Sequence, residues 1–550
     1  MYKIRNYITD HAEFFTILGL CILFYFIFFH NIWSYALMDV DESRYVSMSK
    51  DMFNSKDFMT LYLNHEFFFE KPPLYFWSEC LSFGLWGKIT EATARFPVAL
   101  YGALSCFMIY ILGRKVVSRT YGIISSLILA TSLEFLILAK FAILDIVLAA
   151  CVTFSVCFGI LTYYVQDKNK KYMWWLFYIF SALAVLAKGI PGFVIPFGSM
   201  FFISIYSKNF KEVFKPVYFI IGFILFFAIT LPWHILMLNI HDPLFFNEYV
   251  MKHHVARFLG SEALGRQQPF YFYLLTILWG FFPWIVSTLP ILINKIIKFD
   301  FSFKSENNTQ KLIVFAGIIS IFTLLFFSSS KTKLITYILP IYPALAILGG
   351  YIWYNYVEKG EYSKIINITV YIVGSIFTLA GIVAMFTQYF LPEQLNLDIS
   401  PAKPLCICLL LLTGILTIVF TKKGKYLYNF ITYVLFMLLL SAFGTGLFFN
   451  IDYKFGQDDL MKFAQLAKEN NKTITCYKFT HKYSLIYYSD TKEPVVYGGD
   501  FEIDDLKREL NKANNYVIIK KKQIDDDIQK LSYNIISEGR RYILIEGNKW

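Results

Sequence analysis

A polar stretch, residues 38–73, directly follows an apolar run that is long enough to cross a bilayer, residues 14–37. Charged side chains beside a membrane are costly to hold there and usually mark a working site. Asp41, Arg44 and Tyr45 are spaced three and four residues apart, so they share one face of a predicted helix. A carboxylate there could act as a base or stabilise positive charge, and the arginine suits an anion.

The two acids beside Asp41 have a simpler explanation as a helix start. Asp39, followed three residues later by Glu42, matches a capping box, in which side chains satisfy the first backbone amides of a helix. This explanation accounts for Asp39 or Glu42 but not for Asp41. Asp41 is therefore the candidate catalytic acid of the stretch.

A second cluster lies at the end of the stretch, in the sequence Phe69-Glu-Lys-Pro-Pro73. A residue before proline favours extended geometry, and successive side chains of an extended strip point in opposite directions. Glu70 and Lys71 are therefore predicted to serve different partners. An ordinary surface ion pair between them is the structural alternative.

Three further charged positions adjoin the predicted third, fourth and fifth spans. Lys140 and Asp145 lie at the junction of the third and fourth, and Lys188 ends the fifth on the same side. A carboxylate in so apolar a run needs a partner or a wet cavity. Asp145 is therefore the second candidate catalytic acid.

Adjacent histidines occur in the second long loop. His253 and His254 diverge on a helix, so at most one of them faces a given site, whereas His254 and Arg257 are three residues apart and can converge. A metal site would pair His254 with a carboxylate such as Glu70. Two ligands so far apart in the chain form no recognisable motif.

A tight turn later in the chain carries Lys331 and Lys333, and Tyr337 follows one helical turn further on. Ordinary snorkelling of lysines at a membrane interface is the structural alternative. One chemistry uses all of these residues, because a lipid-linked sugar phosphate has an anionic leaving group at the membrane surface. Lysines, an arginine or a cation would stabilise the departing phosphate, and a carboxylate would act near the anomeric carbon.

The composition identifies the class of protein that must position these groups. The chain has 550 residues, of which 57% are hydrophobic and only 17% charged, and its apolar runs recur at about 20 residues, the length that crosses a bilayer. We predict a polytopic α-helical membrane protein with thirteen spans, at residues 14–37, 94–113, 120–138, 142–164, 173–188, 190–207, 216–237, 270–292, 312–329, 334–354, 365–390, 404–421 and 429–450.

The loops predict the orientation. Short basic loops alternate with longer ones, and the positive-inside rule places the basic set and the amino terminus in the cytoplasm. Outer loops 38–93 and 238–269 then form the site of a transmembrane catalytic domain, residues 1–450. Residues 451–550 alternate helical and β-type runs, which predicts a small α/β domain outside the membrane, in the periplasm of a bacterium. The net charge of +11 lies in short loops, so no nucleic-acid partner is expected.

At these residues the chain resembles the bacterial lipid A aminoarabinose transferases, within the wider group that includes protein O-mannosyltransferases and has the membrane glycosyltransferase C fold. The resemblance covers nearly the whole chain. Its markers, in order, are Asp41-Glu-Ser-Arg-Tyr45, Phe69-Glu-Lys-Pro72, the Asp145 segment, Lys188-Gly189, Leu231-Pro-Trp233, His254 to Phe258, and Lys333-Leu-Ile-Thr-Tyr337-Ile-Leu.

The resemblance implies undecaprenyl-phosphate-linked sugar as donor and lipid A phosphate as acceptor, in a monomeric enzyme of the bacterial inner membrane. It implies catalytic roles for Asp41 and Asp145 and a divalent metal, zinc or magnesium, held by Glu70 and His254. The residues expected at the donor phosphate are Lys71, Arg44, Tyr45, Arg257, Lys331, Lys333 and Tyr337.

The sequence also departs from the family pattern, and these departures leave the sugar open. His253 stands where a glutamate usually precedes the histidine, and Ile335 replaces a proline. Galactosamine or a neutral hexose is as compatible as aminoarabinose. A protein O-glycosyltransferase and, from another class, a lipid or sugar transporter are the alternatives. A transporter would carry broken helices and charges near mid-membrane, whereas the polar clusters here lie at one face.

Overall fold

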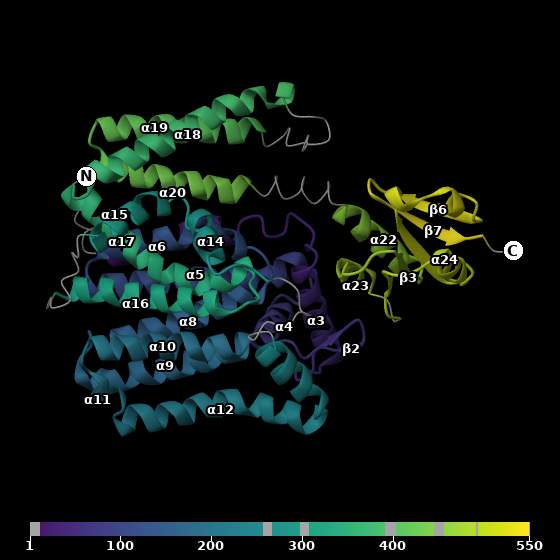
Figure 1. Cartoon of the computed structure of the whole chain (residues 1–550), viewed down its shortest axis with the longest axis horizontal. Coiled ribbons are helices and arrows are strands. Elements are labelled where there is room, and N and C mark those ends of the chain that lie inside the picture. Colours follow the sequence, from purple (N-terminus) through teal and green to yellow (C-terminus); the bar gives the residue numbers. More distant parts are fainter. Residues whose placement is uncertain are drawn as a thin grey trace.

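The computed structural model describes residues 11–256, 267–297, 307–390, 403–444, 456–490 and 493–548. Its helices run side by side along the long axis of the molecule, and a small sheet domain stands at one end of them (Figure 1). The polar segments of the sequence, α3, β2 and α4, lie at that same end (Figure 1).

The helical part consists mostly of α-helices, with π-helical turns at η1 and η2 and a 3-10 segment at η4. Its helices are α2 Ala12–Phe24, η1 Tyr25–Phe29, α3 Asp41–Ser55, α4 Leu74–Trp86, α5 Glu91–Val116, α6 Arg119–Ala130, α7 Leu133–Leu138, α8 Leu144–Leu161, α9 Asp167–Lys188, α10 Ile190–Tyr206, α11 Phe210–Val213, α12 Pro216–His241, η2 Phe246–Ala256, α14 Phe272–Gly280, α15 Ile285–Ile297, α16 Asn308–Ser329, η4 Ile335–Ile341, α17 Tyr342–Lys359, α18 Ser363–Phe390, α19 Lys403–Lys422 and α20 Tyr426–Phe443. A short antiparallel hairpin, β1 Tyr62–Leu63 and β2 Glu66–Phe67, follows α3.

The protein crosses the membrane several times. In the described part of the chain, nine helices are long and apolar enough to span a bilayer. Four of the thirteen predicted spans fall short of that standard: 120–138 is divided between α6 and α7, 270–292 is divided between α14 and α15, 190–207 is a shorter apolar helix, and 173–188 belongs to the more polar α9. The first predicted helix, 14–37, is also too long, because helical structure ends at Phe29.

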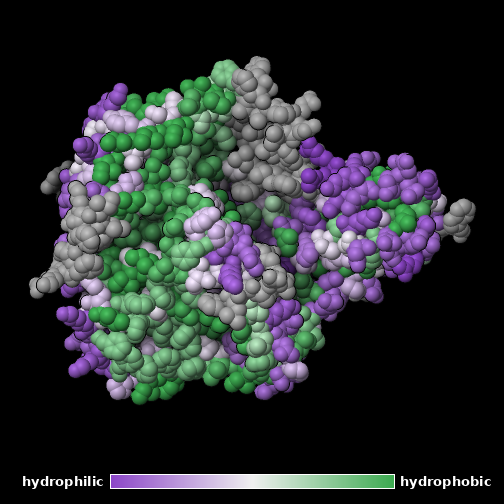
Figure 2. Space-filling model, viewed as in Figure 1, coloured by the Kyte–Doolittle hydropathy of each residue, from purple (hydrophilic) through white to green (hydrophobic). Residues whose placement is uncertain are grey.

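The distribution of side chains on the surface agrees with membrane insertion. Hydrophobic residues cover much of the helical body, whereas hydrophilic residues cover the sheet domain (Figure 2). Large apolar side chains such as Phe14, Leu85 and Leu379 are more than half exposed, which is the arrangement expected of lipid-facing positions.

The sheet domain is an α/β unit, as the alternating sequence pattern predicted. Its five strands lie in the order β4-β3-β5-β7-β6, with β3 parallel to β4 and β5, and β7 antiparallel to β5 and β6. Its elements are α22 Gln457–Glu469, β3 Thr473–Tyr477, α23 Ser484–Ser489, β4 Val496–Gly498, α24 Ile503–Leu510, β5 Asn515–Lys520, η6 Lys521–Gln523, α25 Asp526–Gln529, β6 Tyr533–Glu538 and β7 Tyr542–Gly547. Separate apolar clusters pack on the two faces of the sheet.

The sheet domain is bonded directly to the helix that carries Asp41. The carboxylate of Asp39 accepts hydrogen bonds from the backbone N–H of Ser484, at 2.9 Å, and from its hydroxyl, at 2.8 Å. The Lys50 ammonium, further along α3, lies 2.9 Å from the Asp490 carboxylate. The start and the middle of α3 are therefore both held by the sheet domain.

Candidate active site

The first turn of α3 presents the predicted polar face. Nη2 of Arg44 donates to Oδ1 of Asp41, at 2.7 Å, and to the Tyr45 hydroxyl, at 3.1 Å. The Asp41 side chain is 46% exposed, whereas that of Arg44 is 16% exposed. The prediction that these three residues converge is confirmed, and Asp41 is the member that a substrate can reach.

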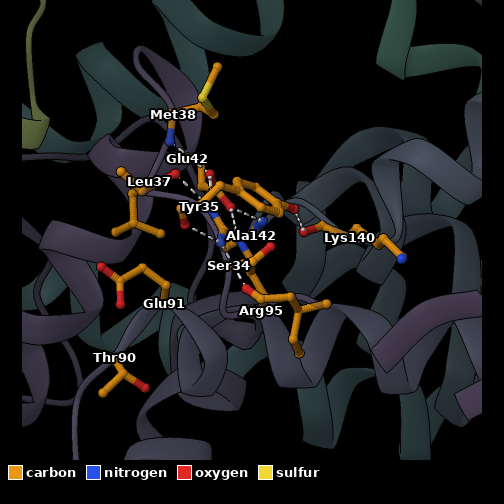
Figure 3. A network of polar contacts seen from close by, with 12 residues as sticks. Ser34, Tyr35, Leu37, Met38, Glu42, Thr90, Glu91, Arg95, Lys140 and Ala142 are labelled. Carbon is orange, nitrogen blue, oxygen red and sulfur yellow. Dashed lines mark hydrogen bonds and ion pairs between the residues drawn. The ribbon is translucent and has the colours of Figure 1, made fainter. Parts of the chain in front are cut away.

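The capping-box prediction for Asp39 and Glu42 is wrong. The residue before the helix is Val40, and no side chain caps its first amides. Glu42 is instead 2% exposed and forms a two-point ion pair with Arg95 of α5, at 2.7 and 2.9 Å (Figure 3). A lone arginine in an apolar run was the sequence signal for this pair.

Arg95 also organises the segment between the first helix and α3. Its Nη1 donates to the carbonyls of Ile32 and Tyr35, both at 2.8 Å, and its Nη2 donates to that of Ala36, at 2.9 Å (Figure 3). These bonds explain why helical structure ends before residue 37. The carbonyls turn inward to a buried cation, and the chain enters α3 from a fixed position.

We expect Glu42→Gln to destabilise the protein by about 3 to 5 kcal/mol, because it leaves the buried Arg95 cation without its counter-charge. The measurement is the thermal midpoint of the purified protein in detergent. Glu66→Gln, at an exposed position of β2, is the control and is expected to change the midpoint little. Equal midpoints for the two variants would contradict a structural role for the pair.

A cavity of about 480 Å³ is lined by several of the predicted residues. Glu70, Lys71 and Tyr337 line it together with Lys188 and His253. The remaining lining is largely apolar and comes from α10, η2, α16 and a nearby loop: Ile190, Pro191, Val194, Val255, Phe326, Phe327, Ser330 and Thr332. The lysines of the cavity suit an anion, and its apolar walls suit a hydrocarbon chain.

The two residues of the extended strip lie within ion-pair distance of each other, and Glu70 also lies near His253. One Glu70 carboxylate oxygen lies 3.9 Å from the Lys71 ammonium, and the other lies 3.9 Å from Nε2 of His253. Lys71 is only 8% exposed. The Lys71 cation therefore lies inside the cavity, within ion-pair distance of the Glu70 carboxylate.

The second candidate acid pairs with the lysine that ends α9. Asp145, in the first turn of α8, forms an ion pair with Lys188, and both side chains are 11% exposed. The Lys188 ammonium also lies 3.9 Å from the centre of the Tyr337 ring. Asp145 therefore orients Lys188, a cavity lysine that was not among the residues expected at the donor phosphate.

The two acids act on one electrostatic site. Burial raises the pKa of the Tyr45 phenol, and the Arg44 cation partly offsets that effect. The carboxylates of Asp41, Asp145 and Glu70 each raise it further. Three carboxylates from three separate segments thus act on one phenol.

The sheet domain adds a residue that the sequence did not indicate. Burial raises the pKa of the Tyr483 phenol, and the charges of Arg44, Glu70 and Asp41 also act on it. Tyr483 therefore lies within electrostatic reach of the site although it is more than 400 residues away in the chain.

The histidine that the structure brings to Glu70 is His253. Its side chain is 5% exposed and lies between Glu70 and Glu248, with Nε2 3.6 Å from the latter. The segment is a π-helix, whose i→i+5 bonds give a smaller angle per residue than the 100° of an α-helix, and the α-helical geometry assumed for His254 is therefore wrong. The side chain of His254 and all of Arg257 lie outside the described residues.

Three or more metal-ligating side chains do not gather anywhere in the portion that the structure describes. Glu70 and a histidine are thus two ligands at most from these residues. This set does not fit a closed structural metal site, which needs four protein ligands.

The two lysines of the late turn have different surroundings. Lys333 is buried, its ammonium donates to the carbonyls of Gln268, at 3.0 Å, and of Ser330, and burial lowers its pKa. Lys331 is exposed. Lys333 therefore braces the wall of the cavity, and a direct contact of either lysine with a phosphate stays a prediction.

Known proteins resemble this chain in sequence and in fold. The family described as "Dolichyl-phosphate-mannose-protein mannosyltransferase" matches residues 13–246. An uncharacterised protein of Aquifex aeolicus is 30% identical over 68% of this chain and 78% of its own length. The undecaprenyl phosphate-alpha-4-amino-4-deoxy-L-arabinose arabinosyl transferase 1 of Proteus mirabilis is 30% identical over 57% of this chain and 54% of its own length.

The fold agrees with these matches. The structure of ArnT from Cupriavidus metallidurans bound to undecaprenyl phosphate covers 98% of this chain, and the chain covers 100% of it, with a TM-score of 0.76 at 19% identity. This chain carries a segment of the protein mannosyltransferase family and is similar to aminoarabinose transferases in sequence and in fold. It spans little more than half the length of the arabinosyl transferases that it matches in sequence. The predicted glycosyltransferase C fold is confirmed.

Proposed function

We propose that this protein is a membrane glycosyltransferase that moves a sugar from undecaprenyl phosphate to a phosphate of lipid A. The observation that carries the proposal is the cavity that Lys71 and Lys188 line together with largely apolar side chains. A polyprenyl phosphate has an anionic head that the lysines can bind and a hydrocarbon chain that the apolar walls can hold. The printed names of the arabinosyl transferases support the same donor and an amino sugar.

The residues fit the steps of such a transfer. An acceptor phosphate oxygen forms a bond to the anomeric carbon while the bond from that carbon to the donor phosphate oxygen breaks, and undecaprenyl phosphate leaves with the electron pair. Lys71, Lys188 and the hydroxyl of Tyr337 would stabilise the charge that develops on the leaving phosphate. Asp145 orients Lys188 through their ion pair.

The role of Asp41 depends on the acceptor. A phosphate oxygen is already ionised at neutral pH, so Asp41 would stabilise positive charge on the sugar and no strong base is needed. A serine or threonine hydroxyl of a protein would need Asp41 as a general base. The match to the mannosyltransferase family favours this second acceptor as the alternative.

Mass spectrometry of lipid A from cells with and without the gene tests the proposal. We expect a mass difference of one sugar residue, and its value identifies the sugar as aminoarabinose, a hexosamine or a hexose. Unchanged lipid A together with a lost glycan on a membrane protein would replace this function by protein glycosylation.

We further propose that the amino terminus is cytoplasmic and that the sheet domain lies in the periplasm, because the short basic loops share one side. In a variant without native cysteines, Lys530→Cys in the sheet domain is expected to react with an impermeant maleimide in intact spheroplasts. Lys211→Cys, in α11, is expected to react only after lysis. The reverse pattern of labelling would overturn the orientation.

A divalent cation, zinc or magnesium, completes the proposal. Glu70 and one of the two adjacent histidines would supply its protein ligands, and the open positions would take phosphate oxygens and water. The sequence predicts His254, whereas the structure favours His253 because its imidazole lies beside Glu70.

Elemental analysis of purified variants decides the metal and its ligand. We expect Glu70→Ala and His253→Ala to lose bound metal to similar degrees, and His65→Ala, at an exposed loop position, to keep it. If His254→Ala loses the bound metal and His253→Ala keeps it, His254 is the ligand. A metal-free wild-type protein with full activity would remove the cation altogether.

A further inference from the structure

A second large groove lies away from the donor cavity and shares no lining residue with it. Its volume is about 580 Å³. Its walls come from α2 and η1 on one side and from α4 and α5 on the other. The lining residues are Cys21, Phe24, Tyr25, Phe29, Ile32, Trp33, Trp86, Lys88, Ala92, Thr93, Phe96, Leu100, Ala103, Leu104 and Phe107.

Aromatic contacts between the two walls form the floor of this groove. The ring of Phe96 lies 5.5 Å from that of Phe29 and 5.7 Å from that of Trp86, and the rings of Phe24 and Phe107 are 4.9 Å apart. Each pair joins one helix to another. The hollow is therefore a feature of packed helices, and its shape does not depend on one loose side chain.

The chemistry of the groove changes along its length as that of a lipid does. Most of the lining is aliphatic or aromatic, Trp33 and Trp86 are more than half exposed, and Lys88 is the only charged side chain in the lining. Tryptophan favours the interface between headgroups and hydrocarbon, and lysine attracts an anionic headgroup. From the middle of the membrane outward, the lining therefore changes from apolar side chains to the two tryptophans and then to Lys88.

The length of the groove fits one leaflet. Along α5 it runs from Ala92 to Phe107, which is about 22 Å at 1.5 Å per residue. One leaflet contributes about 15 Å of hydrocarbon, half of a core of about 30 Å, and headgroups occupy the rest. An acyl chain of a lipid from the leaflet nearest the sheet domain therefore fits, whereas a polyprenyl chain that crosses the core does not.

The charged end of the groove is adjacent to the active site. Ile32 lines the groove, and its carbonyl accepts from Arg95, which holds Glu42 in the first turn of α3. Asp41 is the preceding residue and is the exposed acid of the site. A headgroup at Lys88 is thus separated from the catalytic helix only by the segment that Arg95 binds.

From this geometry we infer that the groove between α2 and α5 binds an acyl chain of the acceptor, an anionic phosphoglycolipid, with Lys88 at a headgroup phosphate. The inference rests on the proposed function, because a transfer between two lipids needs a separate hydrocarbon site for each. The donor cavity would hold the hydrocarbon of the donor, and this groove would hold that of the acceptor.

Native mass spectrometry of the full-length protein in detergent, with lipid A as the probe, tests the inference without catalysis. Leu104→Trp fills the groove at a position that is 40% exposed. We expect it to lower retention of lipid A at least tenfold and to leave retention of undecaprenyl phosphate unchanged. Ile111→Trp, on α5 but outside the groove and 49% exposed, is the matched control and is expected to leave both unchanged.

A second variant tests the headgroup contact at the surface, where folding is not at risk. Lys88→Glu is expected to lower retention of lipid A and not that of undecaprenyl phosphate. Equal retention of lipid A by Leu104→Trp and Ile111→Trp would overturn the inference, as would phosphatidylglycerol that binds the groove in preference to lipid A. A wild-type protein that fails to retain undecaprenyl phosphate would instead overturn the proposed function.

Discussion

Asp41→Asn is expected to lower the turnover number at least about a hundredfold, the usual scale for a positioned acid–base or electrostatic group. The substitution keeps the size of the side chain and removes its charge. Asp41 is the half-exposed member of the first turn of α3, so its loss should leave the fold intact. The measurement is the rate of sugar transfer by protein reconstituted with donor and acceptor.

The same helix offers a matched control. Asp51 lies on α3, is exposed and faces away from the donor cavity, so Asp51→Asn should leave transfer nearly unchanged. Donor binding should survive in Asp41→Asn, because the lysines of the cavity remain. If Asp41→Asn keeps most of its activity, the exposed acid of α3 is not catalytic and attention moves to Asp145.

Lys71→Ala is expected to abolish detectable transfer and to weaken binding of undecaprenyl phosphate. Removal of one preorganised donor to a developing anion costs about a hundred- to a thousandfold in rate. Lys71 is buried in the cavity, so water is poorly placed to replace its charge. Lys71→Arg keeps the charge but changes its geometry and should restore only part of the activity.

An exposed lysine of the same outer loop controls for a general effect of charge. The Lys56 ammonium lies over the ring of Phe53, outside the cavity lining, and Lys56→Ala should transfer sugar at the normal rate. Retention of undecaprenyl phosphate measured by native mass spectrometry separates binding from chemistry. Near-normal turnover in Lys71→Ala would remove this lysine from the site.

Short-range periodicity predicted part of the site correctly. Asp41, Arg44 and Tyr45 converge because helical spacing places residues three and four apart on one face, and that rule needs no tertiary information. Residues 69–73 lie outside any helix, as the proline that follows Lys71 predicted. The class of protein followed from hydropathy, because a bilayer imposes a minimum length on every apolar helix.

The pairs that join distant segments could not be predicted in the same way. Asp145 and Lys188 are 43 residues apart, and Glu42 and Arg95 are 53 residues apart, so only the packed bundle brings them together. Which histidine lies beside Glu70 depends on the π-helical geometry of η2, and no residue type in the sequence predicts a π-helix. The local rule for a capping box was satisfied by the sequence, but a buried arginine competes for the same carboxylate.

The bonds from Asp39 to Ser484 have a consequence for the order of events during synthesis. The ribosome makes α3 first, and about 440 further residues follow before Ser484 exists, a delay of roughly 20 to 90 s at 5 to 20 residues per second. During that time the membrane helices can insert, but the start of α3 lacks the partner that fixes it. The nascent enzyme therefore remains without a fully assembled site until its last domain has folded. A premature stop yields an inserted protein whose catalytic helix keeps its ion pair with Arg95 but lacks both contacts from the sheet domain.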